Sequence, residues 1–386
     1  MANTRPSTEV AVDREASSLA TDLASKTAIV IVAYNSGAAL EKCLASVRRT
    51  APAAQVVLVD NASTDASADR ASGSYPEVRL IRSDANIGFG AGNNLGAAHS
   101  DREFLVFINP DTVVLDGWLE AMLRPMADDP TIGLVTPKVL LQSDPSLINV
   151  AGLDVHLSGI SMCRGAGESK EGFDRAEEVA AVSGVAFAAR RAVYEALGGF
   201  DPAFFLYMED VDLSLRARLG GYRCLYVPDP VVLHEYEMRL DPQKTFYVER
   251  GRYLMLLKSF SARTLFALLP ILLLAEVITW GWVFLLRPSA AGQKAKAASW
   301  VVRHWDEIME ARRKVQTRRS VPDAHVLVHI SVSLAYSQLA GQRLARVAAW
   351  IWNPMPLFAP KYSAVTEAFT PSTMPTLSAA ARKGLR

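Results

Sequence analysis

The feature that most constrains the fold is a regular alternation of short apolar runs and helical segments between residues 27 and 108. The runs are continuously apolar and rich in β-branched residues, a pattern typical of strands that are buried on both faces. They are TAIVIVA (Thr27–Ala33), QVVLVD (Gln55–Asp60), Val78–Ile81 and EFLVFI (Glu103–Ile108), with helical spacing between them at Leu40–Arg49 and Gly90–His99. Strands that alternate with helices predict an α/β unit with a mostly parallel sheet and right-handed crossovers.

The pattern becomes less regular after Ile132, where we expect shorter strands and glycine-rich loops. The predicted elements are a strand at Val182–Ala189, helices at Arg190–Leu197 and Met208–Leu219, and a last strand at Cys224–Val227. We expect the last strand to end at Pro228, because proline cannot donate a hydrogen bond to a neighbouring strand.

A long apolar segment, Thr264–Leu286, follows this part of the chain and carries a single charge, Glu276. As a helix it would be roughly 35 Å long, which is enough to cross a bilayer core of about 30 Å. Both of its flanks are basic, however, and the positive-inside rule disfavours placing either flank outside. Because Pro270 and Gly281 could break the helix, we expect a re-entrant or interfacial element rather than a crossing. A buried core helix is the remaining alternative.

Charge and composition exclude several classes of protein. Lysine and arginine total 41 and aspartate and glutamate 40, so a basic nucleic-acid coat and an acidic tail are both excluded, and no nucleic acid is expected as a partner. Residues 1–26 lack the apolar run of a signal peptide, so we expect a disordered leader and a cytoplasmic catalytic part. The expected domains are then 27–260 (catalytic), 261–352 (helical and membrane-associated) and 353–386 (a flexible tail).

Polar side chains follow three of the predicted strands at the point where each strand ends. They are Tyr34-Asn35, Asp60-Asn61 and Asn109-Pro110-Asp111. A lone aspartate after a strand is usually a helix cap or a turn former, but three such ends in succession favour a ligand site, because ligands bind beyond the carboxyl ends of parallel strands. Asp111 is suited to hold a divalent cation that bridges a diphosphate, and Asp60 is suited to accept hydrogen bonds from a nucleobase or ribose.

Six motifs occur in an order that, taken together, is highly specific. They are YNS at 34–36, VDNASTD at 59–65, NIGFGAGNN at 86–94, INPD at 108–111, GGFD at 198–201 and FLYMEDVDLSLR at 205–216. In this arrangement the chain resembles the inverting family 2 glycosyltransferases, and within them the rhamnosyltransferase-like bacterial enzymes, over about residues 27–260. The resemblance implies the GT-A fold (a Rossmann-like mixed sheet), a nucleotide-sugar donor, a divalent metal (Mn²⁺ or Mg²⁺) and transfer to an acceptor hydroxyl. It implies that Asp60 contacts the nucleobase, that Asp111 binds the metal and that Asp210 is the catalytic base.

The chemistry of sugar transfer requires the same residue types. A positioned carboxylate takes the proton of the attacking hydroxyl, and Asp210 is our candidate, with Glu209 as an acceptor-binding or structural neighbour. Acidic residues also favour a helix N-terminus for electrostatic reasons alone, and Asp212 fits that explanation because Arg216 lies four residues later. His234 is a candidate metal ligand, since the family often has a histidine at this place, and an imidazole favours Mn²⁺ over Mg²⁺.

The glycine-rich loop Gly88-Phe89-Gly90-Ala91-Gly92 does not follow a strand directly, which argues against a dinucleotide fingerprint and an oxidoreductase. We expect it to pack closely against the donor, with Asn86 and Asn93 near the ribose or phosphates and Asn109 among the donor-binding residues.

The resulting prediction is an enzyme at the cytoplasmic face of a bacterial membrane. It would add one sugar, with dTDP-rhamnose or a UDP-hexose as donor, to a cell-envelope or polysaccharide acceptor that a polyprenyl lipid carries. Two alternatives stay open. A non-catalytic nucleotide-sugar-binding membrane protein is suggested by Asn109, where many relatives carry a further carboxylate. A processive polysaccharide synthase shares the same core, but its Q-x-x-R-W motif and several membrane spans are not found in the sequence.

Overall fold

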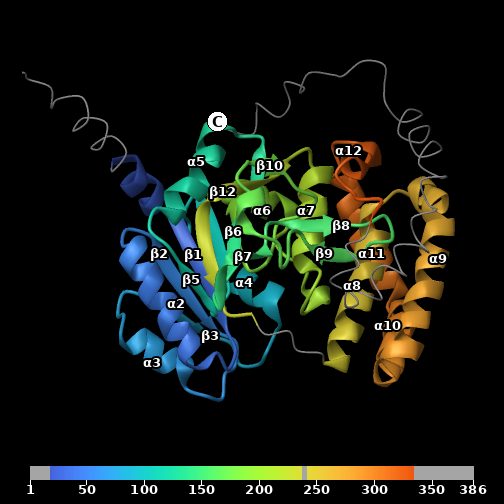
Figure 1. The fold of residues 1–386 in the computed structure, drawn as a ribbon, viewed down its shortest axis with the longest axis horizontal. Helices are drawn as coiled ribbons and strands as arrows, with labels where there is room; N and C mark the ends of the chain where they lie inside the picture. Colours follow the sequence, from blue (N-terminus) through green and yellow to red (C-terminus); the bar gives the residue numbers. More distant parts are fainter. Residues whose placement is uncertain (1–17, 237–240, 334–386) are drawn as a thin grey trace, which may run out of the picture. The chain divides into compact units, whose positions relative to one another are not determined.

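The computed structural model describes residues 18–236 and 241–333, which are built around one ten-stranded mixed sheet (Figure 1). Its strands run in the order β10-β12-β6-β11-β4-β1-β2-β3, with β5 paired to β12 and β7 paired to β6. The first strands are β1 (Thr27–Ala33), β2 (Gln55–Asp60), β3 (Arg79–Arg82), β4 (Phe104–Ile108) and β5 (Thr112–Val114). The others are β6 (Ile132–Leu141), β7 (Asp144–Val150), β10 (Glu177–Glu178), β11 (Ala186–Arg190) and β12 (Arg223–His234). A separate hairpin is formed by β8 (Leu153–Val155) and β9 (Ser161–Cys163).

The N-terminal half of the sheet is parallel, as the alternation of strands and helices predicts: β1 pairs with β2 and β4, and β2 pairs with β3. The connecting helices are α2 (Gly37–Thr50), α3 (Ser67–Gly73) and α4 (Phe89–Ala97). The chain steps from β1 to β2 to β3 in one direction and then returns to place β4 on the other side of β1. With right-handed crossovers, α4 must then cover the face opposite to α2 and α3. The strand order therefore reverses between β1 and β4.

The later strands differ from the sequence expectation in one instructive way. β6 is a long strand rather than a short one, and β12 does not end at Pro228 but continues to His234. The register between β12 and β6 shifts between Val227 and Val231, so the Pro-Asp-Pro segment bulges out and the ladder resumes after it. The expected strand end is thus wrong, because a bulge removes the need for the prolines to donate hydrogen bonds.

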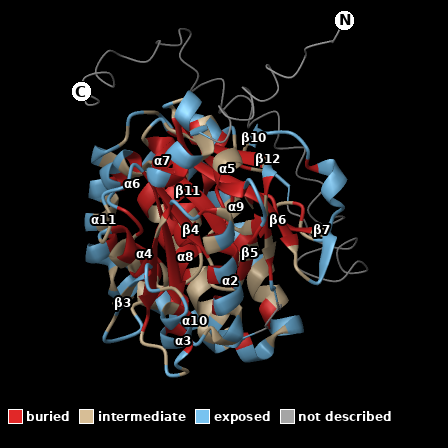
Figure 2. Cartoon of the chain, turned by 90° about the vertical axis from the view of Figure 1, so that its left-hand side faces the viewer, coloured by how far each residue is buried: buried red, intermediate tan, exposed pale blue. Residues whose placement is uncertain are grey.

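The core lies between the sheet and the helices α4, α6 (Arg191–Leu197) and α7 (Glu209–Leu219). Phe107, Phe187, Tyr194 and Phe200 form an aromatic cluster in which Phe107 and Phe187 stack at 4.9 Å between ring centroids. Helix α5 (Trp118–Asp128) packs on β12 and β6. Figure 2 shows buried strands inside and exposed residues along the outer sides of the helices. The hydrophobic burial fixes the strands that carry the candidate site.

Helices make up most of the remaining described chain. They are α8 (Pro242–Ser259), α9 (Ala262–Leu286), α10 (Ala291–Arg303), α11 (Trp305–Thr317) and α12 (Asp323–Leu327), with short 3₁₀ turns η1 (Lys170–Gly172), η2 (Pro202–Phe204) and η3 (Pro288–Ala290). The apolar segment is one continuous helix, so the break expected at Pro270 and Gly281 is wrong. It is also not a core helix, since only 17% of its most apolar window is buried.

The predictions for the leader and for the C-terminal region fall partly or wholly outside the described residues. Residues 18–25, which the sequence assigns to the leader, are helical, with Leu23 and Ala24 buried, and thus differ from the expectation of disorder. The rest of the leader, residues 334–352 and the predicted tail at 353–386 lie outside the described residues.

Candidate active site

The candidate residues gather at the carboxyl edge of the parallel strands, where the strand order reverses between β1 and β4. Tyr34 and Asn35 follow β1, Asp60 ends β2, and Asn109 follows β4. In open α/β sheets, ligands bind in the crevice that such a reversal opens. The fold therefore brings the three predicted strand-end clusters to one edge.

The loops after β1 and β2 are tied together by side-chain hydrogen bonds. Oδ1 of Asn35 accepts hydrogen bonds from Thr64 N (2.7 Å) and Thr64 Oγ1 (3.1 Å). Oδ1 of Asp60 accepts one from Ser63 N (2.9 Å), and its Oδ2 lies 3.2 Å from Arg82 Nη1. Tyr34 is half exposed beside them. These contacts hold the two loops together beside the exposed ring of Tyr34 and a carboxylate that is paired to an arginine.

Asn61 connects this edge to the glycine-rich loop. Its Nδ2 donates to Asn86 Oδ1 (3.0 Å), and its Oδ1 accepts from Ile87 N (3.0 Å). Asn86 Oδ1 also accepts from Gly88 N (3.0 Å), which fixes the loop from inside. The amide of Asn93 is buried and donates to Phe89 O (3.0 Å) in its own helix. Asn61 and Asn86 therefore shape the loop, whereas the Asn93 amide is used within α4.

Only glycine fits at position 88, because the backbone of Phe205 packs against it. Its φ is +84°, and a Cβ atom there would lie 2.3 Å from the carbonyl oxygen of Phe205. Phe89 N donates to the same oxygen at 2.8 Å. The glycine-rich loop thus packs against the turn before α7, a contact of the protein with itself that the sequence assigned to the donor.

The turn that precedes α7 has an unusual backbone. Phe205, Tyr207 and Met208 all have positive φ values between 63° and 70°. Left-handed conformations cost energy for residues with side chains, and they cluster at functional sites where the surrounding structure enforces them. Here they precede Glu209 and Asp210, the first residues of α7.

Asp210 is connected directly to the end of β4. Its Oδ2 accepts a hydrogen bond from Gly184 N (2.8 Å), while the carbonyl of the next residue, Val185, accepts one from Asn109 N (2.9 Å). A Cβ atom at position 184 would lie 3.2 Å from Asp210 Oδ2, so a glycine allows the close approach. Only two backbone segments, 184–185 and 109–111, therefore separate Asp210 from Asp111.

Burial changes the acidity of both carboxylates at the start of α7. It raises the pKa of Glu209 to about 8, and the nearby charge of Asp210 adds to the effect. Burial also raises the pKa of Asp210, although hydrogen bonds from the backbone of Gly184 and Val211 oppose the shift. Oε2 of Glu209 is buried and has no hydrogen-bond partner among the described residues. Raised carboxylate pKa values of this kind are typical of groups that transfer protons.

Asp111 and His234 meet because β12 continues past its prolines. His234 pairs with Thr112 of β5, and its Nε2 lies 3.2 Å from Asp111 Oδ1. Its Nδ1 is 2.9 Å from Asn149 Oδ1, and in the tautomer whose Nδ1 donates to this oxygen the lone pair of Nε2 faces the carboxylate. Asp111 Oδ1 is buried and accepts no hydrogen bond from a described residue. A carboxylate oxygen and an imidazole nitrogen that face each other in this way fit a cation.

The described residues contain no cluster of three or more histidine, cysteine or acidic side chains that could hold a metal. Asp111 and His234 would supply two ligands to a metal, and further ligands would have to come from a bound molecule or from water. Such an open site is typical of metals that also contact a substrate.

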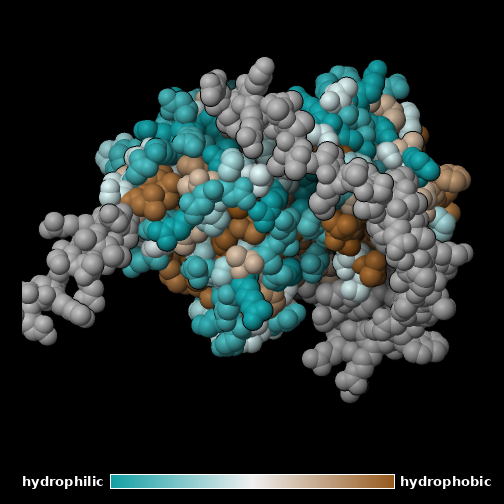
Figure 3. Space-filling view, turned by 90° about the horizontal axis from the view of Figure 1, so that it is seen from above, coloured by the Kyte–Doolittle hydropathy of each residue, from teal (hydrophilic) through white to brown (hydrophobic). Residues whose placement is uncertain are grey.

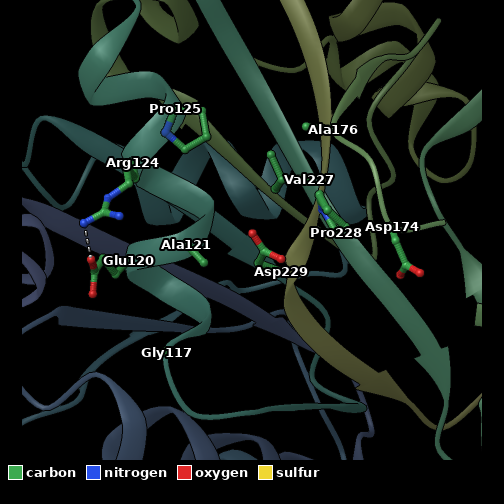
Figure 4. A pocket seen from close by; sticks show the side chains of 10 residues that line it. All are labelled: Gly117, Glu120, Ala121, Arg124, Pro125, Asp174, Ala176, Val227, Pro228 and Asp229. Atoms are coloured by element: carbon green, nitrogen blue, oxygen red, sulfur yellow. Dashed lines mark ion pairs between the residues drawn. The ribbon is translucent and has the colours of Figure 1, made fainter. Parts of the chain in front are cut away.

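A surface cavity of about 490 Å³ lies elsewhere, between α5 and the bulge of β12 (Figure 4). Glu120, Arg124, Asp174 and Asp229 line it, and Arg124 pairs with Glu120 at 3.1 Å. None of the predicted site residues lines this cavity, so it is not part of the candidate active site.

Comparisons with known proteins identify the family of the chain. The model of "Glycosyl transferase family 2" matches residues 28–197, which include β2, β4 and the loops that follow β1, β2 and β4. An N-acetylglucosaminyl-diphospho-decaprenol L-rhamnosyltransferase of Mycobacterium tuberculosis is 32% identical over 231 residues, which cover 53% of this chain and 75% of that protein. The chain belongs to glycosyltransferase family 2.

More distant relatives of this family 2 glycosyltransferase extend the comparison. A pre-mycofactocin glycosyltransferase of Mycobacterium tuberculosis is 26% identical over 223 residues, which cover 57% of this chain but only 45% of that protein. The crystal structure of GalNAc-T7 with UDP, GalNAc and Mn²⁺ superposes with a TM-score of 0.52 at 18% identity, covering 62% of this chain and 48% of that chain. The mixed sheet with its helices is thus the GT-A fold, as the resemblance in sequence implies.

The structure adds three residues to the site that the sequence did not suggest. Gly184 holds Asp210, Arg82 pairs with Asp60, and Asn149 contacts the imidazole of His234. Arg82 ends β3 next to Asp60 in the parallel register, so a correct strand alignment would have found it. Gly184 and Asn149 carry no local signal, because their roles depend on tertiary contacts.

Proposed function

We propose that this family 2 glycosyltransferase moves one sugar from a nucleotide-sugar donor to an acceptor hydroxyl and inverts the anomeric configuration. The observation that carries the proposal is the short backbone connection between Asp210 and Asp111 through Gly184 and Val185. In a direct displacement, the general base that takes the acceptor proton and the group that binds the leaving diphosphate lie on opposite sides of the reacting anomeric carbon. The proposed catalytic domain is 27–260, with the membrane-associated helices following at 261–352.

Asp210 is the proposed general base. Its Oδ2 is held by the backbone of Gly184, which fixes the carboxylate at the edge of the sheet. When the acceptor hydroxyl attacks the anomeric carbon, its proton passes to Asp210, and the bond to the diphosphate breaks on the opposite side. Glu209, with a pKa raised to about 8, is protonated at neutral pH and would donate a hydrogen bond to the acceptor or to the protein.

Asp111 and His234 are the residues that would hold a divalent metal. Their facing acceptor atoms, 3.2 Å apart, fit a cation with oxygen and imidazole ligands, which favours Mn²⁺ over Mg²⁺. A bound metal would supply Lewis-acid stabilisation of the leaving diphosphate. Asn149 would keep the Nε2 lone pair of His234 directed at the cation.

The proposed donor site is the edge formed by Tyr34, Asn35, Asp60, Asn61 and Asn109. Asp60 would accept hydrogen bonds from the base or ribose, and the exposed ring of Tyr34 would stack on the base. Asn86 and Asn93 would contribute indirectly, because their amides hold the glycine-rich loop and α4 in place.

The proposed donor and acceptor follow the rhamnosyltransferase relative: dTDP-rhamnose, with a UDP-hexose as the alternative, and a sugar on a polyprenyl diphosphate. An acceptor of this kind would place the enzyme at the cytoplasmic face of a bacterial membrane, where the product would enter cell-envelope or polysaccharide synthesis.

One observation favours a second candidate, a non-catalytic protein that binds nucleotide sugars. Only two protein ligands, Asp111 and His234, face a possible metal among the described residues. A processive synthase has less support, since the described residues contain one helix, Ala262–Leu286, that is long and apolar enough to cross a membrane.

The test is acceptor-dependent release of nucleoside diphosphate. The full chain is incubated with Mn²⁺, with dTDP-rhamnose, UDP-GlcNAc or GDP-mannose, and with or without a GlcNAc-diphospho-polyprenol acceptor. We expect one donor to be consumed only when the acceptor is present, with a product that is larger by one sugar. Donor binding by calorimetry without consumption at any acceptor would support the non-catalytic candidate, and a ladder of products would support the synthase.

A further inference from the structure

Helix α9 exposes an unbroken apolar face. The large side chains on this face lie at helical spacing, and six of them are between 41% and 84% exposed: Phe266, Leu273, Leu274, Val277, Phe284 and Leu285. Soluble proteins rarely expose contiguous apolar surface of this length. In Figure 1 the helix lies at the right-hand edge, and Figure 3 shows apolar side chains at the surface on that side. Exposed apolar surface of this kind is typical of a site that binds a partner or a membrane.

The opposite face of α9 is fixed to the protein by charged groups. Glu276, at the middle of the helix, pairs with Arg252 of α8 and with Lys294 of α10, whose Nζ lies 3.2 Å from its Oε2. Tyr253 Oη donates to the same carboxylate at 2.9 Å. Lys294 also donates to Thr279 Oγ1 at 2.9 Å. The side chains of Arg252 and Lys294 are 2% and 0% exposed, so separating α9 from the protein would leave two buried cations without one of their partners.

Charge around α9 favours an anionic partner. Residues 261–319 contain ten lysines and arginines but four aspartates and glutamates, in a chain with a net charge of only +1. Arg263 is exposed at one end of the apolar face, and Arg287 lies at the other end over the ring of Trp282, 5.2 Å from its centroid. Basic residues at both ends of an apolar stripe complement the headgroups of anionic lipids along the whole length of the helix.

We propose that α9 lies in the plane of an anionic lipid bilayer, with the face of Phe266, Leu273, Val277 and Phe284 immersed and the Glu276 face held against α8 and α10. A perpendicular crossing would draw α8 and α10 into the hydrocarbon with it, because the buried ion pairs keep the three helices together. It would also place Glu276 and its two cations near the bilayer centre, at high cost. In the plane, the apolar face is buried and the ion pairs stay intact.

This inference refines the membrane partner of the proposed function, and its test does not depend on sugar transfer. In the full chain, Cys163 is replaced by serine while the buried Cys43 and Cys224 stay, and single cysteines are introduced as F266C, V277C or L285C. Each variant is labelled with a thiol-reactive fluorophore and mixed with vesicles of phosphatidylcholine and phosphatidylglycerol. Lipids with a spin label at shallow or deep acyl positions then report the depth of the fluorophore. D101C, an exposed position in the catalytic part, is the control.

We expect equal, shallow depths at 266, 277 and 285, no quenching at 101, and a binding loss of about tenfold or more for V277D in the same vesicles. Binding should also fall in vesicles of phosphatidylcholine alone. Circular dichroism and the melting temperature show whether each variant is folded. A label at 277 that is much deeper than those at 266 and 285 would overturn the in-plane arrangement in favour of a crossing. Absence of vesicle binding, with α9 labels shielded in a dimer of the free protein, would assign the face to a second copy instead.

Discussion

The strand edge and the helical region both bury acidic side chains, but the two regions differ in how these side chains are paired with cations. Around α8, Glu249 lies between Arg252 (2.8 Å) and Lys294 (2.6 Å); burial would raise its pKa, yet these two cations hold it below the usual value. At the strand edge, burial raises the pKa of Glu209 to about 8, and no described cation pairs with it. The buried carboxylate of Glu249 in the helical region is thus paired with two cations, whereas that of Glu209 is paired with none among the described residues.

The difference teaches where to look for chemistry in such a chain. Paired buried charges fix how helices pack and gain nothing from a ligand. Buried oxygens without a hydrogen-bond partner among the described residues, such as Asp111 Oδ1 and Glu209 Oε2, cost folding energy that a bound cation or substrate hydroxyl can offset. α8 joins the two regions, since Lys258 pairs with Asp212 (2.9 Å) and Arg250 donates to the carbonyl of Phe204 behind the α7 turn.

The largest effect is expected for Asp210→Asn. The amide retains an acceptor for Gly184 N but cannot take a proton, so turnover should fall at least about a hundredfold while the donor dissociation constant stays nearly unchanged. Initial rates of nucleoside diphosphate release and calorimetric donor titrations measure the two quantities. Asp229→Asn, an exposed carboxylate at the distant cavity, is the control. Unchanged turnover in D210N would refute the role of the base.

Arg252→Met tests the paired region. It leaves the carboxylates of Glu249 and Glu276 with one cation instead of two, and we expect a loss of about 3 kcal/mol in the free energy of unfolding. Urea titrations measure it. Arg124→Met, which breaks the exposed pair with Glu120, should cost less than about 1 kcal/mol. Equal effects of the two variants would mean that burial does not distinguish these pairs.

Asp111→Ala tests the unpaired edge. Removal of a carboxylate ligand should weaken Mn²⁺-dependent binding of the nucleotide donor roughly tenfold to a hundredfold. The stability of the protein without metal should stay the same or rise, because a buried unpaired oxygen is lost. Calorimetry with and without EDTA measures the affinity, and Asp116→Ala, exposed near α5, is the matched control. If EDTA affects wild type and D111A equally, Asp111 does not hold the metal.

The smallest effect is expected for Glu209→Gln, in the pH dependence of stability. The pKa of this carboxyl is about 8 in the folded protein, against 4.5 in the unfolded chain. Folding therefore takes up a proton between these values, and the stability of the wild type decreases as pH rises from about 5 to about 8. Glutamine removes this contribution, so E209Q should gain at least about 1 kcal/mol over the wild type at pH 8 relative to pH 5. Parallel urea titrations of the exposed control E195Q should follow the wild type.

The sequence predicts the fold at this edge well, because its signals are local. The β-branched runs give β1, β2 and β4, the alternation gives their parallel order, and the i, i+4 spacing gives the Asp212–Arg216 pair, which is present at 2.7 Å. The course of β12 past Pro228 is not local, since it depends on pairing with β6 and β5. For that reason no local signal predicts the contact between His234 and Asp111, and the sequence implies it only through the family resemblance that makes both residues candidate metal ligands.

The charged interior of the helical region was missed for the same reason. The sequence shows Glu276 as an isolated charge in an apolar run, and nothing nearby in the chain reveals that Arg252 and Lys294 meet it. The length and hydropathy of α9 thus follow from the sequence, whereas the face that stays exposed depends on its contacts with Arg252 and Lys294.

The central claim is that the buried carboxylate of Asp210 acts as a base in one direct displacement. The anomeric configuration of the first-formed product, determined by ¹H NMR against that of the donor, tests it most directly. Inversion is the predicted result. Retention would contradict the account, because it would require two displacements and a carboxylate that bonds to the sugar as a nucleophile.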